Sequence, residues 1–221
     1  MPQLKSKIFD LCKKELPRVI EIRRDIHQHP EPGFEVHRTA GVVVSQLKDA
    51  GLKIRTGVGK TGVVADLEIP GATKRILLRA DMDALPIQEE NDKPYKSKTD
   101  GVAHMCGHDT HTAMLIGAAR VLSQLKDQLK VNVRFMFQPN EECSPEGGAQ
   151  GMIADGVLEG VDEAYALHVS NRFEPGQVAL NPGVMFAQSD KFDMTIIGKG
   201  GHAAHPESVI DPIVIGAQFV T

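Results

Sequence analysis

The sequence contains no tryptophan, two tyrosines and three cysteines in 221 residues. The cysteines, Cys12, Cys106 and Cys143, are odd in number and widely spaced, so they do not predict a disulfide framework. No hydrophobic run approaches the roughly 18–20 residues that span a bilayer. The N-terminal residues also lack the apolar block of a signal peptide. We therefore expect a cytoplasmic protein.

The sequence also lacks an excess of positive charge. Its 25 Lys and Arg against 29 Asp and Glu give a formal net charge of −4. Nucleic-acid binding requires concentrated Lys and Arg, so nucleic acid is not an expected partner. Residues 57–61 resemble the end of a phosphate-binding loop, but Ile54 stands where that pattern needs a glycine. The abundant functional side chain is instead histidine, which occurs nine times.

Hydrophobic patterning predicts helices in the first quarter of the chain, with Pro17 opening the second of them. Short apolar segments then alternate with helical patterns, which predicts an α/β fold with a largely parallel sheet. The tail begins with a further strand candidate and ends in a helix capped by Asp211. The strand candidates are residues 62–68, 75–79, 131–137, 163–169 and 191–197, and the main helix is residues 110–125.

Side chains that ligate metals gather in four groups: two follow the strand candidates 75–79 and 131–137, one precedes the helix 110–125, and one lies at the end of the strand candidate 163–169. Each group alone has an ordinary structural explanation, as a turn, a packed histidine or a solvated loop. Their recurrence at strand ends is what predicts a metal site. Cysteine and histidine together favour zinc or a neighbouring transition metal over magnesium or calcium. The four groups are Asp81 with Asp83, the run His104–His111, Glu141 with Glu142, and His168.

Seven stretches, in order along almost the whole chain, resemble the metal-dependent amidohydrolases of peptidase family M20. The resemblance is to the branch of N-acyl-amino-acid, hippurate and auxin-conjugate hydrolases. Asn140 departs from the family pattern, which more often has alanine there. The stretches are Asp25–Glu31, Arg79–Pro86, His104–Asp109 with Thr112–Leu115, Phe137–Glu142, Gly147–Ala149, Leu167–Val169 and Gly198–Ala204.

The resemblance implies a role for each matching residue. Cys106 would bridge two divalent metal ions, and His108 and His168 would complete the protein ligands of one of them. Glu142 would hold the other ion. Glu141 would act as the general base and acid, taking a proton from the attacking water and passing it to the leaving amine.

Two further residues gain roles in the same way. Asp83 would support the catalytic site from just outside the ligands, whereas contact of Asp81 with metal stays open. His202 would reach across a dimer to polarise the scissile carbonyl of the substrate. The substrate would be an N-acyl amino acid or a related small amide.

The resemblance also implies the architecture. Residues 1–186 would form an incomplete zinc-peptidase-like catalytic domain of three layers with a mixed, largely parallel sheet. Residues 187–221 would begin an inserted α+β lid and dimerisation domain, and a complete lid would make a homodimer. The cofactor would be one or two divalent ions per chain: zinc, manganese, cobalt or nickel.

Members of this family are longer than this chain, and no histidine follows His205. We expect one metal with three protein ligands and a second with only Cys106 and Glu142, and hence weak or no hydrolysis by this chain. The alternative is a catalytically inactive truncated metal-binding fragment, or one half of a split enzyme. A structural zinc domain is disfavoured, because such sites are closed Cys/His tetrahedra with short paired spacings.

Overall fold

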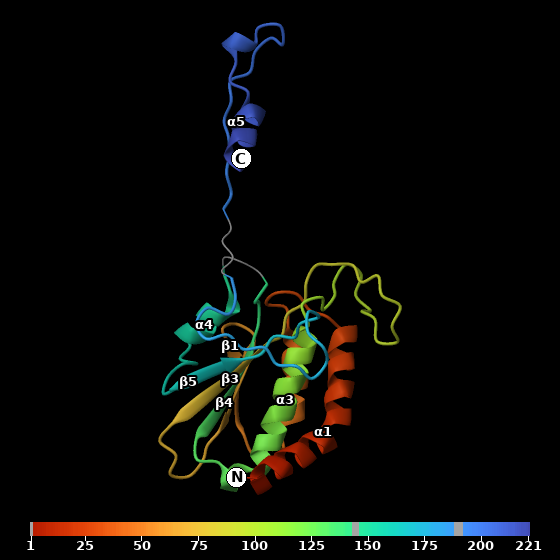
Figure 1. Cartoon of the computed structure of the whole chain (residues 1–221), viewed down its shortest axis with the longest axis vertical. Helices are drawn as coiled ribbons and strands as arrows, with labels where there is room; N and C mark the ends of the chain where they lie inside the picture. The colour runs from red at the N-terminus through yellow and green to blue at the C-terminus, as the bar shows by residue number, and fades with distance from the viewer. Residues whose placement is uncertain (1, 143–145, 188–191) are drawn as a thin grey trace. The chain divides into compact units, whose positions relative to one another are not determined.

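The computed structural model describes residues 2–142, 146–187 and 192–221. The chain forms two compact units, Met1–Pro175 and Gly176–Thr221 (Figure 1). The predicted domain boundary at residues 186 and 187 stays a prediction. The first unit is built on a five-stranded sheet of order β1-β2-β4-β3-β5. Its strands are β1 (Lys53–Val58), β2 (Gly62–Leu67), β3 (Arg75–Asp81), β4 (Asn132–Gln138) and β5 (Glu163–Ala166).

The sheet is mixed, as predicted. β3 pairs in parallel with both β4 and β5, whereas β2 pairs antiparallel with β1 and β4. Along β2, Val63 and Ala65 face one hydrophobic core, while Val64 between them faces a second core on the other side of the sheet. This alternation follows from the two-residue period of a strand that is covered on both faces.

Helices cover the two faces and complete the predicted three layers. Three helices contribute to the larger core, and Met152 of α4 contributes to the smaller one. Figure 1 shows α1 and α3 running along the same side of the sheet. The helices of this unit are α1 (Pro2–Gln28), α2 (His37–Leu47), α3 (His108–Gln124), the 3-10 turn η1 (Lys126–Gln128) and α4 (Gly148–Ala154).

The expected second helix at Pro17 is wrong, because α1 continues through Pro17 as one helix of 27 residues. A proline inside a helix removes one backbone hydrogen bond and bends the axis, and α1 changes direction along its length (Figure 1). Packing on α3 outweighs that local cost: Ile22 and Ile26 are buried, and Val19 sits so close to Gly117 that a Cβ there would lie 2.7 Å from it.

The second unit contains a 3-10 turn, η2 (Pro206–Ser208), and the helix α5 (Pro212–Val220). The predicted cap is confirmed: the Asp211 carboxylate accepts a hydrogen bond from the Ile213 N–H at 2.9 Å. The strand expected at 191–197 is wrong for residues 192–197, which form no strand; residue 191 lies outside the described residues. A strand needs a pairing partner, and in the described part of this unit only Lys199 and Ile210 form an isolated bridge.

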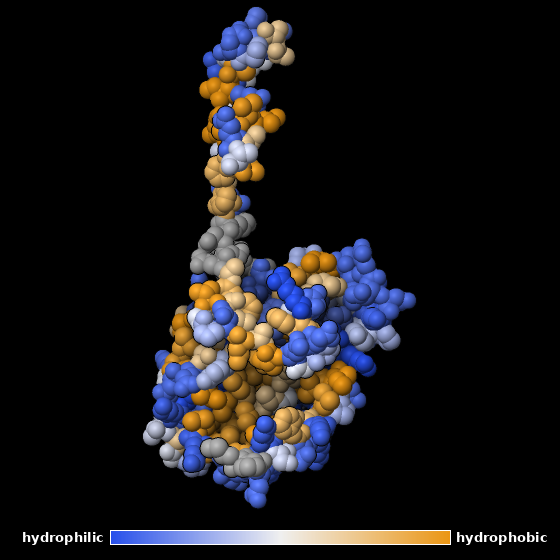
Figure 2. Space-filling model, viewed as in Figure 1, coloured by the Kyte–Doolittle hydropathy of each residue, from blue (hydrophilic) through white to orange (hydrophobic). Residues whose placement is uncertain are grey.

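β5 lies at one edge of the sheet, and all four of its residues are exposed. Hydrophobic residues are exposed on the first unit (Figure 2). At and just after β5, Tyr165 and Leu167 are 54% and 64% exposed. Cys12 and Cys106 are free thiols, while Cys143 lies outside the described residues. Within residues 2–142, 146–187 and 192–221, no helix is both long and apolar enough to cross a membrane.

Candidate metal centre

The predicted ligand segments meet at one edge of the sheet. The parallel strands β3 and β5 both end there, and the run after β4 and the first turn of α3 join them. Side chains from these four segments form three overlapping groups whose donor atoms lie within 4.8 Å of one another. The groups are Cys106, His108 and His168; Asp81, His108 and His111; and His108, Glu141 and Glu142.

His108 stands at the centre of these groups and is fully buried. Its Nδ1 lies 2.9 Å from the backbone oxygen of Asp83, so Nδ1 carries the hydrogen and donates. Its Nε2 has no hydrogen-bond partner among the described residues, and neither does Oε1 of Glu142, which lies 3.6 Å away. Two buried lone-pair atoms that face each other without a hydrogen bond are costly, and divalent cations bound at this point would satisfy both. These residues therefore fit a metal ion.

Asp83 connects the two segments that carry His108 and Glu142. Its backbone oxygen accepts from His108, and its carboxylate Oδ2 accepts from the backbone N–H of Glu142 at 3.1 Å. The side chain is fully buried. One residue, two positions after the end of β3, thus fixes both a donor from α3 and a donor from the run after β4, which is the arrangement expected of a support just outside the ligands.

Cys106 and His168 complete the group on the other side of His108. Cys106 Sγ lies 3.3 Å from His168 Nε2, and His168 Nδ1 lies 2.6 Å from the backbone oxygen of Val169. The second contact puts the ring hydrogen on Nδ1 and turns the Nε2 lone pair toward the sulfur. Burial, reinforced by the carboxylate of Glu142, raises the pKa of the Cys106 thiol to about 12, so a cation binding there must displace a proton.

Glu141 differs from Glu142 although the two are adjacent. The Glu141 side chain is 41% exposed and that of Glu142 is 19% exposed. Glu141 Oε2 is 3.8 Å from His108 Nε2. Partial burial, with the charge of Glu142 next to it, raises the pKa of Glu141 above the usual range of a carboxyl. A raised pKa brings the group closer to neutrality and suits it to accept and return a proton.

The backbone just before this pair forms a turn that is held against α4. Asn140 adopts a left-handed conformation with φ of 50°, which asparagine tolerates better than most residues. Its backbone oxygen accepts from the Gly148 N–H at 2.9 Å, which holds the start of α4 against the turn. Gly148 allows this approach because a Cβ there would lie 1.9 Å from the Pro139 oxygen.

Asp81 is already engaged by other side chains. One carboxylate oxygen lies 2.6 Å from His111 Nδ1 and the other 2.6 Å from Arg79 Nη1. Burial alone would raise the pKa of Asp81, but the His111 hydrogen bond and the Arg79 charge outweigh it and lower that pKa to about 2. Sequence reasoning placed His111 in a candidate ligand run without assigning it a role of its own, and gave no role to Arg79. The spacing of His111 three residues after His108, on one helix face, was the available signal.

His202 belongs to the second unit. There its ring lies 5.8 Å from that of His205, centroid to centroid, and its Nδ1 accepts from the Ala204 N–H at 3.2 Å. The predicted contact of His202 with substrate stays a prediction.

A second buried polar cluster lies under the loop that carries Cys106. His27 of α1 bonds the Asp109 carboxylate through Nδ1 at 2.7 Å, and its Nε2 is 3.3 Å from Glu89. Arg23 also contacts Asp109 at 2.7 Å. The hydrogen bond to Asp109 raises the pKa of His27, although burial and Arg23 oppose the shift. The ring of His104, 6.3 Å from that of His27, is kept neutral by burial, which lowers its pKa to about 4.

This cluster predicts a pH dependence of stability. A histidine whose pKa is higher folded than unfolded stabilises the fold fully below about pH 6.5, and the contribution is lost as pH rises through the folded pKa. We expect the free energy of unfolding, measured by urea titration, to fall as pH rises above about 6.5, and to fall less in His27→Gln. An equal fall in both proteins would contradict this assignment.

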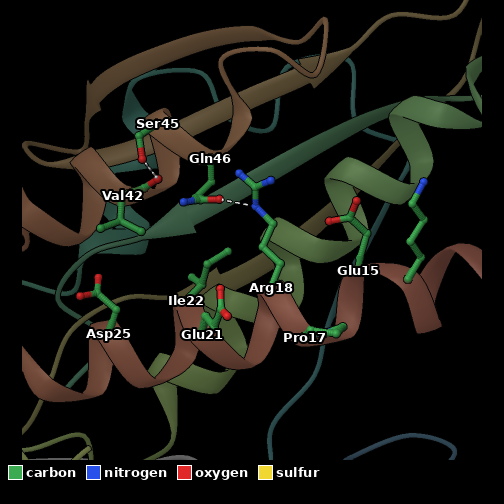
Figure 3. Close-up of a pocket in the computed structure, with 10 residues that line it drawn as sticks. Glu15, Pro17, Arg18, Glu21, Ile22, Asp25, Val42, Ser45 and Gln46 are labelled. Carbon is green, nitrogen blue, oxygen red and sulfur yellow. Dashed lines mark hydrogen bonds between the residues drawn. The ribbon is translucent and has the colours of Figure 1, made fainter.

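A separate groove of about 770 Å³ lies between α1 and α2 (Figure 3). Two of its charged side chains already have protein partners: Arg18 donates to Gln46, and Asp25 accepts twice from Arg38. None of the predicted site residues lines this groove. The candidate ligands and the candidate general base therefore lie where β3 and β5 end, not in this groove.

A mixed sheet with thiol, imidazole and carboxylate groups gathered where its strands end defines an α/β metalloprotein. The chain matches Peptidase family M20/M25/M40 over residues 77–218. It belongs to this family, as the sequence motifs predicted.

Two curated relatives and one solved structure are similar to this chain. The chain is 45% identical over 217 residues to an N-acyl-L-amino acid amidohydrolase of Geobacillus stearothermophilus, covering 98% of this chain and 58% of the relative. It is 40% identical over 222 residues to IAA-amino acid hydrolase ILR1-like 5 of Arabidopsis thaliana, covering 100% and 50%. The crystal structure of Bacillus subtilis YXEP, a dinuclear metal binding peptidase from the M20 family, matches with a TM-score of 0.67 and 42% identity, over 72% of this chain and 44% of that one. The chain spans about half the length of the curated relatives it matches.

Proposed function

We propose that this chain carries the metal site and the general base of an amidohydrolase that cleaves the amide bond of N-acyl amino acids or related conjugates. The observation that carries the proposal is the pair of buried, unpartnered donor atoms, His108 Nε2 and Glu142 Oε1, 3.6 Å apart. The names of the relatives supply the reaction class. One names an N-acyl amino acid amidohydrolase and another an IAA-amino acid hydrolase.

The ligands are assigned from the donor set. Cys106, His108 and His168 would hold one divalent ion, and Glu142 with Cys106 would contact a second. A thiolate with imidazoles suits zinc, manganese, cobalt or nickel, in the Cys/His chemistry of borderline metals. When bound, the ion polarises the amide carbonyl and lowers the pKa of water.

The chain's own residues supply the proton transfers. Glu141, half-exposed next to the ligands, takes a proton from the attacking water and gives it to the leaving amine. Asp83 keeps His108 and Glu142 in place while this happens, because it bonds both segments. An amide is hard to cleave because its amine must leave protonated, and Glu141 meets that need.

The experiment measures metal content and hydrolysis in one sample. The purified chain is stripped with a chelator, reloaded with zinc or cobalt, freed of excess ion and assayed for release of amino acid from N-acyl amino acids. We expect about one bound ion per chain and hydrolysis, even if slow, that the chelator abolishes. A chain that retains no metal would refute the proposal, whereas bound metal without hydrolysis would favour the inactive fragment or split enzyme.

A further inference from the structure

Strand pairing does not fix the position of His168. The pairing of β5 with β3 ends at Ala166 and Arg79, so His168 lies two residues beyond the last paired residue. The segment is exposed and at the sheet edge. Another contact must therefore hold the imidazole near Cys106.

Val169, the next residue, is held from two sides. Its backbone N–H donates to His111 Nε2 at 2.9 Å. Its side chain packs over Gly107, where φ is +85° and a Cβ would lie 2.4 Å from Val169 Cγ2. The rings of His111 and His168 also meet edge to face, with centroids 4.6 Å apart. The start of α3 and the loop before it thus hold the segment that follows β5 in place.

The contacts of His111 define one tautomer. Its Nδ1 lies 2.6 Å from a carboxylate oxygen of Asp81, which can only accept, so Nδ1 carries the hydrogen. Its Nε2 accepts from Val169 and so carries none. A neutral imidazole has one donor and one acceptor, and both are used here. His111 therefore has no lone pair left for a metal, although it lies among the candidate ligands.

We propose that His111 is a positioning residue: fixed by Asp81, it holds the backbone of Val169 and thereby sets His168 next to Cys106. The inference rests on the proposed function only in treating His168 as a ligand. The hydrogen-bond chain from β3 through α3 to the segment after β5 runs through protein atoms alone.

Two substitutions separate the two bonds of His111. In His111→Gln the amide oxygen takes the place of Nε2 and can still accept from Val169. In His111→Asn the amide nitrogen takes the place of Nδ1 and can still donate to Asp81, but nothing reaches Val169. Glutamine and asparagine are both polar and are similar to histidine in size or smaller. The two variants therefore form a matched pair that differs in which hydrogen bond is kept.

The first measurement uses the metal-free chain. We expect ¹⁵N shifts of the His111 ring to show hydrogen on Nδ1, and the Val169 amide to exchange at least about tenfold faster in His111→Asn than in the wild type or His111→Gln. Hydrogen on Nε2, or equally fast Val169 exchange in the wild type and His111→Asn, would overturn the proposal. The ring shifts need no variant and stand even if a variant fails to fold.

The second measurement is a Co²⁺ titration. We expect His111→Asn to weaken Co²⁺ binding about 10–100-fold, as outer-shell contacts do, and His111→Gln to change it little. If His111 acts through His168, adding His111→Asn to His168→Ala should cause no further loss; additive losses would overturn the proposal. A wild-type chain that binds no Co²⁺ would refute the proposed function alone, because the metal-free measurement still decides the role of His111.

Discussion

Glu141→Gln is expected to lower kcat for N-acyl amino acid hydrolysis by about 10²–10⁴-fold, the usual contribution of a general acid or base, and to leave the bound metal unchanged. Glutamine keeps the size of the side chain but cannot take a proton from water or return one to the amine. Its amide has no reason to disturb the ligands, because Glu141 is 41% exposed and lies at 3.8 Å from His108 Nε2. The measurements are steady-state kinetics and metal analysis of the same preparation.

The adjacent glutamate provides the matched control. Glu142→Gln is expected to weaken binding of the second ion by more than the roughly 10–100-fold typical of an outer-shell contact, because the buried Glu142 Oε1 would ligate that ion directly, and to leave the ion held by Cys106, His108 and His168 in place. Metal loss in Glu141→Gln with metal retained in Glu142→Gln would reverse the two roles. Since metal binding is measured without turnover, this comparison holds at any level of activity.

Arg134→Met is expected to lower the free energy of unfolding by about 3–5 kcal/mol, the cost of leaving a buried charge without its partner. Arg134 of β4 and Asp66 of β2 form a two-point ion pair with contacts of 2.7 and 3.2 Å, and both residues are buried. Arg134 also donates to the backbone oxygens of Val157 and Glu159, at 2.7 and 3.2 Å, in the segment that leads to β5. The measurement is urea unfolding at neutral pH.

Two further variants test the cause. Asp66→Leu combined with Arg134→Met should recover part of the loss, because apolar replacement of both partners removes the unpaired charge; the carbonyls of Val157 and Glu159 still lack their donor. Arg75→Met, which removes a longer contact of 3.4 Å to Asp66 and a pair with the exposed Glu68, should cost about 1 kcal/mol or less. A cost for Arg75→Met equal to that of Arg134→Met would contradict the assignment to burial.

Strong apolar periodicity made most of the first unit predictable. β4 and α3 were expected close to their bounds because both are buried and keep one period throughout. β1 was not expected, since it is an edge strand with mostly exposed residues and little apolar pattern. α4 was not expected either, because seven residues with two glycines have low helix propensity; its burial of Met152 comes from tertiary packing.

The candidate metal centre was likewise predictable only in part. The motifs and the family resemblance predicted that Cys106, His108, Glu142 and His168 would lie together, and the structure brings them into overlapping groups; their roles as ligands stay predictions. Hydrogen bonds that depend on backbone atoms were not predictable, such as the Val169 N–H to His111 or the Glu142 N–H to Asp83. Sequence patterns carry no information on which backbone group a side chain meets.

The edge position of β5 has a consequence for the fate of the protein. β5 joins β3 over only four residues from a distant part of the chain, so it should assemble late and open first. If His168 and His108 hold an ion as proposed, that ion would stabilise only the closed arrangement, by an amount that grows with the free ion concentration. When metal is scarce, proteases would then cleave the chain after β5 while the rest of the sheet is still intact.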